Sequence, residues 1–278
     1  MATQRDTLSA EQVESFVRDG FVRIPEAFSR TVAEAGRAEL WRLAGVDPND
    51  PAGWTRPVIR VEGSGAEPFR QAANTERLRV AFDQLVGAGR WLPRLGLGSF
   101  PIRFPHPDEP GDDGWHLDAS FSGGANGTEY RINLRSRGRA LLMLFLFTDV
   151  GEEDAPTRIK VGSHRDVPPF LADAGEEGRE FFELCRAMDE AGRLNAPDRP
   201  VALATGRAGD VYLCHPFLVH AAQPHRGSRP RIIAQPPLDP VAPLQLARAD
   251  GAYSPVEAAV RLGLGLDEPT GPTGPTGP

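Results

Sequence analysis

The chain has 278 residues, of which 40% are hydrophobic, and its formal net charge at pH 7 is -7. Such a chain can bury a sizeable core in one large domain or two ordinary ones, and its negative charge argues against nucleic acid and anionic membranes as partners. The longest apolar run, residues 141–147, suits a buried strand and is too short to span a bilayer.

The first residues and the cysteines indicate the compartment. Residues 1–12 contain no apolar signal region, and the two cysteines, Cys185 and Cys214, favour a reducing cytoplasm over a disulfide scaffold. The glycosylation sequon at Asn126 is therefore interpreted as a chance triplet in a loop. We expect a cytoplasmic protein whose partner is a small molecule, and the sequence leaves its oligomeric state open.

Residues 8–94 are expected to be mainly helical. Ser9 and Gln12 have the spacing of a capping box, and Gly20 is placed to end the helix that they begin.

Further helices are expected to open at Thr31 and at Asn74 or Thr75, because these side chains can cap a helix N-terminus. Residues 21–25 and 58–61 are apolar enough to predict short strands between the helices.

From about residue 95 to residue 240 the pattern changes to short apolar runs separated by turn residues, which is typical of an all-β sandwich or barrel. The predicted fold class is therefore mainly β with flanking helices, as a double-stranded β-helix (a cupin-like jelly roll). The expected strands cover residues 100–104, 115–121, 130–136, 139–150, 157–162, 210–220 and 229–238.

One insertion, residues 175–194, interrupts this series of strands. Leu184 and Met188 share a face at helical spacing, so the insertion is expected to be a helix. Two roles are open to it: a helix packed on the outside of the barrel, or a lid over the barrel mouth.

A last helix is expected at about residues 254–262, because Ser254 can cap it and Pro255 suits its first position. Residues 267–278 repeat Gly, Pro and Thr and are expected to be a disordered tail. We therefore predict a single domain over residues 1–266.

A possible metal site begins with His116 and Asp118. In an extended segment, residues two apart point to the same side, so both side chains could contact one ion. Such pairs are common by chance, and a metal site needs a third ligand from elsewhere in the chain.

The candidates for that ligand are His215, His220 and His225. The first two would face opposite sides of a regular strand, so only one can face the barrel interior, and the neighbours of the third indicate a turn. Arg231 lies on the next expected strand, where its guanidinium could bind a carboxylate with two hydrogen bonds. Two histidines, a carboxylate and an arginine together describe a facial triad for iron(II) with a carboxylate-bearing cosubstrate.

This combination of motifs resembles the phytanoyl-CoA dioxygenase family of iron(II)- and 2-oxoglutarate-dependent oxygenases. The resemblance covers about residues 8–240 and rests on HLD at 116–118, on HPFLVH at 215–220 with Gly-Asp before it, and on the arginine that follows. The segments at 8–29 and 155–164 add to it.

The family uses the second histidine of the HPFLVH-like stretch as a ligand, which selects His220 over His215. The resemblance therefore implies that His116, Asp118 and His220 are the metal ligands and the catalytic centre. It also implies that Arg231 binds the distal carboxylate of 2-oxoglutarate.

One position departs from the family pattern. A serine commonly follows the distal histidine by two residues and helps to hold the cosubstrate, whereas this chain has Ala222. Candidates for the missing helper are Arg60, Arg103 and Thr157, each of which could equally be structural. Phe145 could pack on the cosubstrate or belong to the core.

The resemblance also implies the chemistry. Iron(II), 2-oxoglutarate and O2 would together hydroxylate a small molecule, for example one of secondary metabolism, with release of succinate and CO2. Asp118 favours hydroxylation over halogenation, because halogenases of this fold lack the carboxylate. Desaturation, epimerisation and ring formation remain open.

Two other classes of protein stay in view. A cupin-like metal protein without 2-oxoglutarate would share the jelly roll and the histidines but would have no use for Arg231. A metal-free β-sandwich would require the whole set of motifs to be a coincidence. A basic run could be a solvated strand and loop or could anchor an anionic substrate; it comprises Arg131, Arg135, Arg137 and Arg139.

Overall fold

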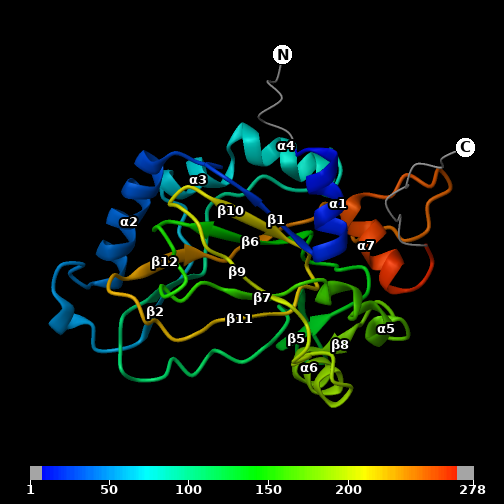
Figure 1. Cartoon of the computed structure of the whole chain (residues 1–278). Helices are drawn as coiled ribbons and strands as arrows, with labels where there is room; N and C mark the ends of the chain where they lie inside the picture. The colour runs from blue at the N-terminus through cyan, green and yellow to red at the C-terminus, as the bar shows by residue number, and fades with distance from the viewer. Residues whose placement is uncertain (1–7, 268–278) are drawn as a thin grey trace, which may run out of the picture.

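The computed structural model describes residues 8–267, and Figure 1 shows several of the helices over one face of a large antiparallel sheet. The larger sheet has seven strands in the order β1-β10-β6-β12-β3-β2, and β13 pairs with the start of β6. These strands are β1 (Phe21–Ile24), β2 (Val58–Val61), β3 (Phe100–Arg103), β6 (Leu141–Leu146), β10 (Val211–Cys214), β12 (Arg231–Ala234) and β13 (Pro237–Leu238).

Two smaller sheets of three strands each complete the β-structure, in the orders β11-β7-β9 and β4-β5-β8. Every pairing in the three sheets is antiparallel, as expected for a jelly roll. The smaller strands are β4 (Phe121–Gly123), β5 (Glu129–Ile132), β7 (Arg158–Lys160), β8 (Arg179–Glu180), β9 (Val201–Leu203) and β11 (His220–Ala221).

Strand β6 separates two hydrophobic cores, and this explains its unbroken apolar sequence. Leu141, Met143 and Phe145 belong to the core beneath the helices. Leu142 and Leu144 point the other way, into a core shared with residues of β7, β10 and β12. A strand covered on both faces reads as a continuous apolar run because its side chains alternate between two dry layers.

The helices form the outer layer of the molecule. In Figure 1, α2, α3 and α4 lie over the larger sheet, while α1 and α7 lie side by side at one end. Within residues 8–267, none of the helices is both long enough and apolar enough to cross a membrane. The helices are α1 (Ala10–Asp19), α2 (Arg30–Ala44), α3 (Glu67–Ala73), α4 (Glu76–Leu85), α5 (Pro168–Leu171), α6 (Phe181–Glu190) and α7 (Pro255–Gly263), with 3-10 turns η1 (Pro51–Gly53) and η2 (Ser163–Arg165).

Several helix boundaries agree with the sequence prediction. Ser9 and Gln12 form the predicted capping box, and Gly20 ends α1 with φ of 90°. A Cβ atom on Gly20 would also lie 2.5 Å from His164 Nδ1, so both conformation and space require glycine there. Thr75 caps α4 and Ser254 caps α7, as predicted.

Two helix predictions need correction. The N-cap of α2 is Ser29, whose hydroxyl accepts from Val32 N, so the helix opens before the predicted Thr31. Helix α3 was not predicted, because its N-cap is Ala66, which offers no capping side chain.

Two strand predictions also need correction. Most of residues 115–121 is not in a strand: only an isolated bridge joins His116 to His220. The predicted strand 210–220 is broken after Cys214, where the chain leaves the larger sheet and crosses to the sheet of β11, β7 and β9. Both departures occur near the candidate ligands His116 and His220, where an isolated bridge replaces continuous strand pairing.

The insertion at residues 175–194 is shorter as a helix than predicted, since α6 covers only Phe181–Glu190. Leu184 and Met188 are buried, and α6 packs on β5 and β8. The helix thus belongs to the outer layer. The predicted tail at 267–278 lies, apart from Asp267, outside the described residues.

Candidate active site

Three side chains from two distant parts of the chain converge: His116, Asp118 and His220. One ligand atom of each lies within 4.8 Å of the others, and His220 Nε2 is 3.9 Å from Asp118 Oδ1. Bonds from nitrogen or oxygen ligands to a transition metal are about 2.0–2.2 Å long, so donors around one ion lie a few ångströms apart. The three residues therefore have the spacing of ligands to a single ion.

A pair of backbone hydrogen bonds sets this spacing. His116 N donates to His220 O and His220 N donates to His116 O, both at 3.0 Å. The two imidazole rings are consequently close, with centroids 4.5 Å apart and planes tilted by 56°. Asp118 follows two residues after the first histidine and lies on the same side.

The orientation of each imidazole is fixed by a carbonyl group. His116 Nδ1 donates to Gly114 O at 2.8 Å, and His220 Nδ1 donates to Leu218 O at 3.0 Å. Because a carbonyl oxygen can only accept, each Nδ1 carries the hydrogen and each Nε2 keeps a free lone pair. Burial lowers the pKa of His220 to about 4, so this imidazole is neutral at pH 7 and able to bind a metal.

Two buried arginines lie beside this group. Arg103 and Arg231 are cross-strand partners on β3 and β12 and are only 3% and 1% exposed. Arg231 Nη2 donates to Ala155 O at 2.7 Å. Arg103 Nη2 donates to both carboxylate oxygens of Asp112 at 2.8 Å.

The remaining donors of this arginine pair are unsatisfied. Nε and Nη1 of both Arg103 and Arg231 have no hydrogen-bond partner among the residues that the structure describes. Burial, together with the like charge of Arg103, lowers the pKa of Arg231 well below its usual value. Buried, unpaired donors and adjacent like charges both cost free energy, and an anion bound between them would offset both costs.

These groups line one cavity of about 280 Å³. Thr157 and Ala222 are on its wall, and Arg60 lies at its edge, where it pairs with Asp112. The full lining consists of Arg60, Gly98, Ser99, Pro101, Arg103, Asp112, His116, Asp118, Arg139, Thr157, His220, Ala222, Arg231, Gln235 and Pro237. A small polar cavity lined by both the buried arginine pair and the His-Asp-His group fits a short dicarboxylate and an ion.

Comparison with known proteins identifies the family. The model of the phytanoyl-CoA dioxygenase family matches residues 16–233, which include all the candidate ligands and Arg231. The chain belongs to the phytanoyl-CoA dioxygenase family. The resemblance predicted from the motifs is thereby confirmed, and with it the enzyme class, a dioxygenase.

A curated relative of this phytanoyl-CoA dioxygenase family member is ectoine dioxygenase from Bordetella parapertussis. The two are 27% identical over 245 residues, which cover 81% of this chain and 73% of the relative. A second ectoine dioxygenase, from Stutzerimonas stutzeri, is 28% identical over 223 residues, covering 73% of this chain and 68% of the relative.

Solved structures confirm the jelly-roll fold. HygX from Streptomyces hygroscopicus, solved with nickel and 2-oxoglutarate bound, superimposes with a TM-score of 0.54 at 22% identity, covering 89% of this chain and 96% of HygX. At this level of identity the likeness shows the fold alone.

Arg139 is a residue of the site that the sequence did not single out. Its Nη1 lies 3.2 Å from Asp118 Oδ2, and its Nη2 donates to Ala119 O at 3.0 Å. Burial raises the pKa of Asp118, but Arg139 and the two histidines outweigh it, so the net shift is downward. The signal in the sequence was the basic run, which ends at this residue. Asp112 was also missed, although it lies only four residues before His116.

The structure separates the other predicted residues from the cavity. His215 is fully buried elsewhere, where its Nε2 donates to Val256 O and its Nδ1 accepts from Phe217 N. His225 lies in a loop, where its Nδ1 accepts from Gly227 N.

The predicted contact between Phe145 and a cosubstrate needs correction. Phe145 points from β6 toward the helices, where its ring lies 5.9 Å from that of Phe28, and it does not line the cavity. It belongs to the core. The alternative role of residues 175–194 as a lid finds no support either, since none of them lines the cavity.

Proposed function

We propose that this protein is an iron(II)- and 2-oxoglutarate-dependent oxygenase that hydroxylates a small molecule. The observation that carries the proposal is the unsatisfied arginine pair beside the His-Asp-His group. Family membership alone would leave the cosubstrate site unassigned, whereas Arg103 and Arg231 offer four buried nitrogen donors that need an anion.

The donor set fits iron(II). His116, Asp118 and His220 would bind the ion through two imidazole nitrogens and one carboxylate oxygen, which is the facial arrangement of non-haem iron oxygenases. Both imidazoles have their second nitrogen bonded to a carbonyl, a partner that orients metal-binding histidines in other proteins.

The arginine pair fits a dicarboxylate such as 2-oxoglutarate. Arg231 would bind the distal carboxylate with its free Nε and Nη1, and Arg103 would be the helper that replaces the family serine at Ala222. Thr157 remains a second candidate because it also lines the cavity. Arg60 is the weakest candidate, since about half of its side chain is exposed and it pairs with Asp112.

Bound together, iron(II) and 2-oxoglutarate would supply the activation of O2 that drives removal of a substrate hydrogen. The protein would supply orientation and a dry environment. The histidine bridge would hold the ligand atoms in place, the arginines would fix one end of the cosubstrate, and the core beneath β6 and β12 would exclude water from behind the site.

The product outcome rests on Asp118. A carboxylate at this position favours hydroxylation over halogenation, because no ligand position is left for chloride. The structural neighbour SnoN, an epimerase whose structure was solved with iron and alpha-ketoglutarate, has a TM-score of 0.53 at 21% identity, covering 81% of this chain and 80% of SnoN. Epimerisation therefore stays as the alternative outcome.

One domain would carry this function. The larger of the two core clusters extends from Leu8 to Val260 and joins the helices to the larger sheet, which supports the predicted domain over residues 1–266. Both cysteines, Cys185 and Cys214, are free thiols, and this supports a cytoplasmic location.

The test is a pooled metabolite assay that scores succinate release. The wild-type protein, iron(II) and 2-oxoglutarate should release succinate above the uncoupled background with at least one pool of small polar metabolites. Arg231→Ala should reduce this release by about a hundredfold or more at limiting 2-oxoglutarate. Turnover that requires iron but does not depend on 2-oxoglutarate would instead support the cupin-like alternative.

A further inference from the structure

A close contact between two loops brings Arg139 to Asp118. Gly138 packs directly on the backbone of Ser120, and a Cβ atom at position 138 would lie 2.1 Å from Ser120 O. Ser136 Oγ donates to Arg139 O at 2.6 Å and closes the turn that carries the arginine. Glycine is therefore required here so that the next residue can reach the segment containing the candidate ligands.

Arg139 is held firmly in this position. Its side chain is 12% exposed, and Nη2 donates to Ala119 O at 3.0 Å. Nη1 lies 3.2 Å from Asp118 Oδ2, close enough for an ion pair although the angle is not that of a hydrogen bond. Nε has no hydrogen-bond partner within residues 8–267.

The two oxygens of Asp118 are thus divided between two neighbours. Oδ2 faces the guanidinium of Arg139, whereas Oδ1 faces Nε2 of His220 at 3.9 Å. A carboxylate can bind a metal through one oxygen or through both. With Oδ2 facing a cation, only Oδ1 is presented to an ion beside the histidines.

We propose that Arg139 is a positioning residue that makes Asp118 a one-oxygen ligand, and that it forms the counter-charge for any anion at that position. This inference rests on the proposed function. If both oxygens of Asp118 bound the ion, the second would occupy a coordination position that the cosubstrate needs. By holding Oδ2 away from the ion, Arg139 would keep that position free.

The first test removes the carboxylate of Asp118 and supplies formate from solution in its place. Asp118→Gly should lose Co(II) affinity, and added formate should restore it by occupying the vacated position beside Arg139. In the double variant Asp118→Gly/Arg139→Gln, the formate concentration needed should rise by about tenfold or more, because a cation close to an anion in a protein contributes at least that factor. Equal formate dependence in both variants, or no rescue in either, would overturn the proposal.

The second test keeps Asp118 and changes the arginine. Anaerobic titration of 2-oxoglutarate into the iron(II) form, followed by visible absorbance, should show a shifted band and about tenfold weaker binding in Arg139→Gln. Arg139→Lys should recover part of both, because it keeps the charge. A spectrum and affinity like those of the wild type in Arg139→Gln would contradict the positioning role.

A matched control separates this effect from general loss of charge. Arg135 belongs to the same basic run, but it donates to Leu244 O and pairs with Glu176, outside the cavity. Arg135→Gln should bind 2-oxoglutarate like the wild type, and a matching loss in this variant would contradict a specific role of Arg139.

The wild-type absorption band and the thermal unfolding of each variant separate the possible causes of a negative result. If the wild type itself gives no 2-oxoglutarate-dependent band, the proposed function fails; if it does and the Arg139 variants match it, only this inference fails. Thermal unfolding should show that each variant is folded. If Arg139→Gln is not folded, Arg139→Lys decides: a 2-oxoglutarate affinity weaker than that of Arg135→Gln supports the positioning role, whereas an affinity equal to that of Arg135→Gln would overturn the proposal.

Discussion

His215 and His220 lie on one short stretch of chain but have opposite surroundings. His220 presents a free Nε2 to Asp118, whereas both nitrogens of His215 are engaged by backbone groups. These surroundings support the proposal that His220 binds the metal and that His215 has a structural role. Arginines differ in the same way: Arg42 and Arg70 pair with glutamates near the surface, whereas Arg231 has buried donors with no partner among the described residues.

Replacing the two histidines separately tests this assignment. His220→Ala should weaken iron(II) binding by more than about a hundredfold, since loss of an outer-shell partner alone costs 10–100-fold. His215→Ala should change metal affinity by less than about threefold but lower the free energy of unfolding by roughly 2–3 kcal/mol, because buried backbone groups lose their partners. Isothermal titration and urea unfolding measure the two effects, and a reversed pattern would show that the ligand is His215.

Arg231 offers a test of cosubstrate recognition. Two charge-assisted hydrogen bonds to one carboxylate are worth about 1.5–3 kcal/mol each, so Arg231→Ala should raise the dissociation constant of 2-oxoglutarate by about a hundredfold or more. Arg231→Lys should recover only part of this, because an ammonium lacks the planar fork. Iron(II) affinity serves as the control, and its collapse in Arg231→Ala would point to a structural role.

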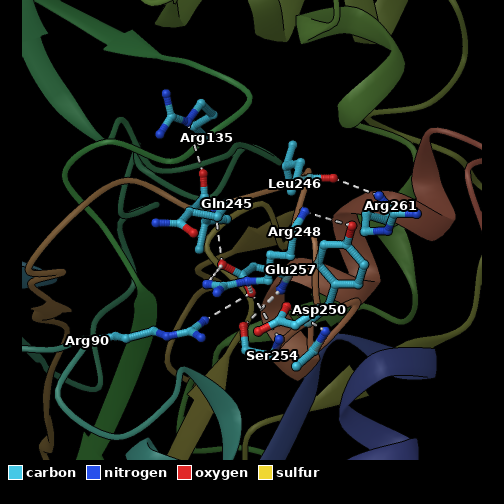
Figure 2. A network of polar contacts seen from close by, with 12 residues as sticks. Arg90, Arg135, Gln245, Leu246, Arg248, Asp250, Ser254, Glu257 and Arg261 are labelled. Carbon is cyan, nitrogen blue, oxygen red and sulfur yellow. Dashed lines mark hydrogen bonds and ion pairs between the residues drawn. The ribbon is translucent and has the colours of Figure 1, made fainter.

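At the scale of elements, a buried carboxylate of helix α7 adds polar contacts to the apolar packing of that helix. Figure 2 shows Glu257 at the centre of a polar network with Arg90 and Arg248. Its oxygens also accept from Ser254 N in the capping box and from Gln245 N at 2.9 Å. Burial raises the pKa of Glu257, but these donors outweigh it and the net shift is downward.

Glu257→Gln should therefore destabilise the protein. The amide keeps the shape of the side chain but leaves two arginines without their counter-charge, and breaking a buried pair costs about 3–5 kcal/mol. Because Arg90 is partly exposed, we expect a loss near the lower end of that range. Glu76→Gln, an exposed first-turn glutamate of α4, should cost less than about 0.5 kcal/mol in the same urea titration. Equal losses in the two variants would refute a special role for the network.

The whole molecule should lose stability in weak acid because it buries neutral imidazoles. Burial lowers the pKa of His215 to about 3, and burial with the neighbouring His215 lowers the pKa of His164 well below its usual value. An unfolded histidine has a pKa of about 6.5, so the unfolded state binds more protons as the pH falls below that value.

The expected result is a free energy of unfolding that is highest above pH 6.5 and falls toward pH 5. Each buried imidazole contributes up to about 1.4 kcal/mol per pH unit in this window. Urea unfolding of the metal-free protein at pH 7, 6 and 5 measures the slope, and His215→Asn should reduce it. A flat profile from pH 7 to 5 would show that the imidazoles are already accessible to protons.

The sequence was most informative where chemistry depends on local spacing. His116 and Asp118 are two residues apart, and the resemblance carried by the motif around His220 completed the group. Arg103 could not be ranked above Arg60, because its approach to Arg231 depends on the pairing of β3 with β12 across the sheet.

The misses have physical reasons too. The contact of Arg139 with Asp118 depends on how closely Gly138 packs on another loop, which no local pattern encodes. Phe145 was ambiguous because both faces of β6 are apolar, so alternation along the strand cannot tell the cavity side from the helix side. The break after Cys214 was hidden by apolar residues that continue past it.

The most direct test of the account is titration of 2-oxoglutarate into the anaerobic iron(II) protein, followed by visible absorbance. The wild type should develop a weak absorption band that saturates with one equivalent of 2-oxoglutarate per chain. His220→Ala should show no band, and Arg231→Ala should reach saturation only at about a hundredfold higher concentration. A wild-type protein that binds iron(II) with no spectral or affinity response to 2-oxoglutarate would contradict the central claim.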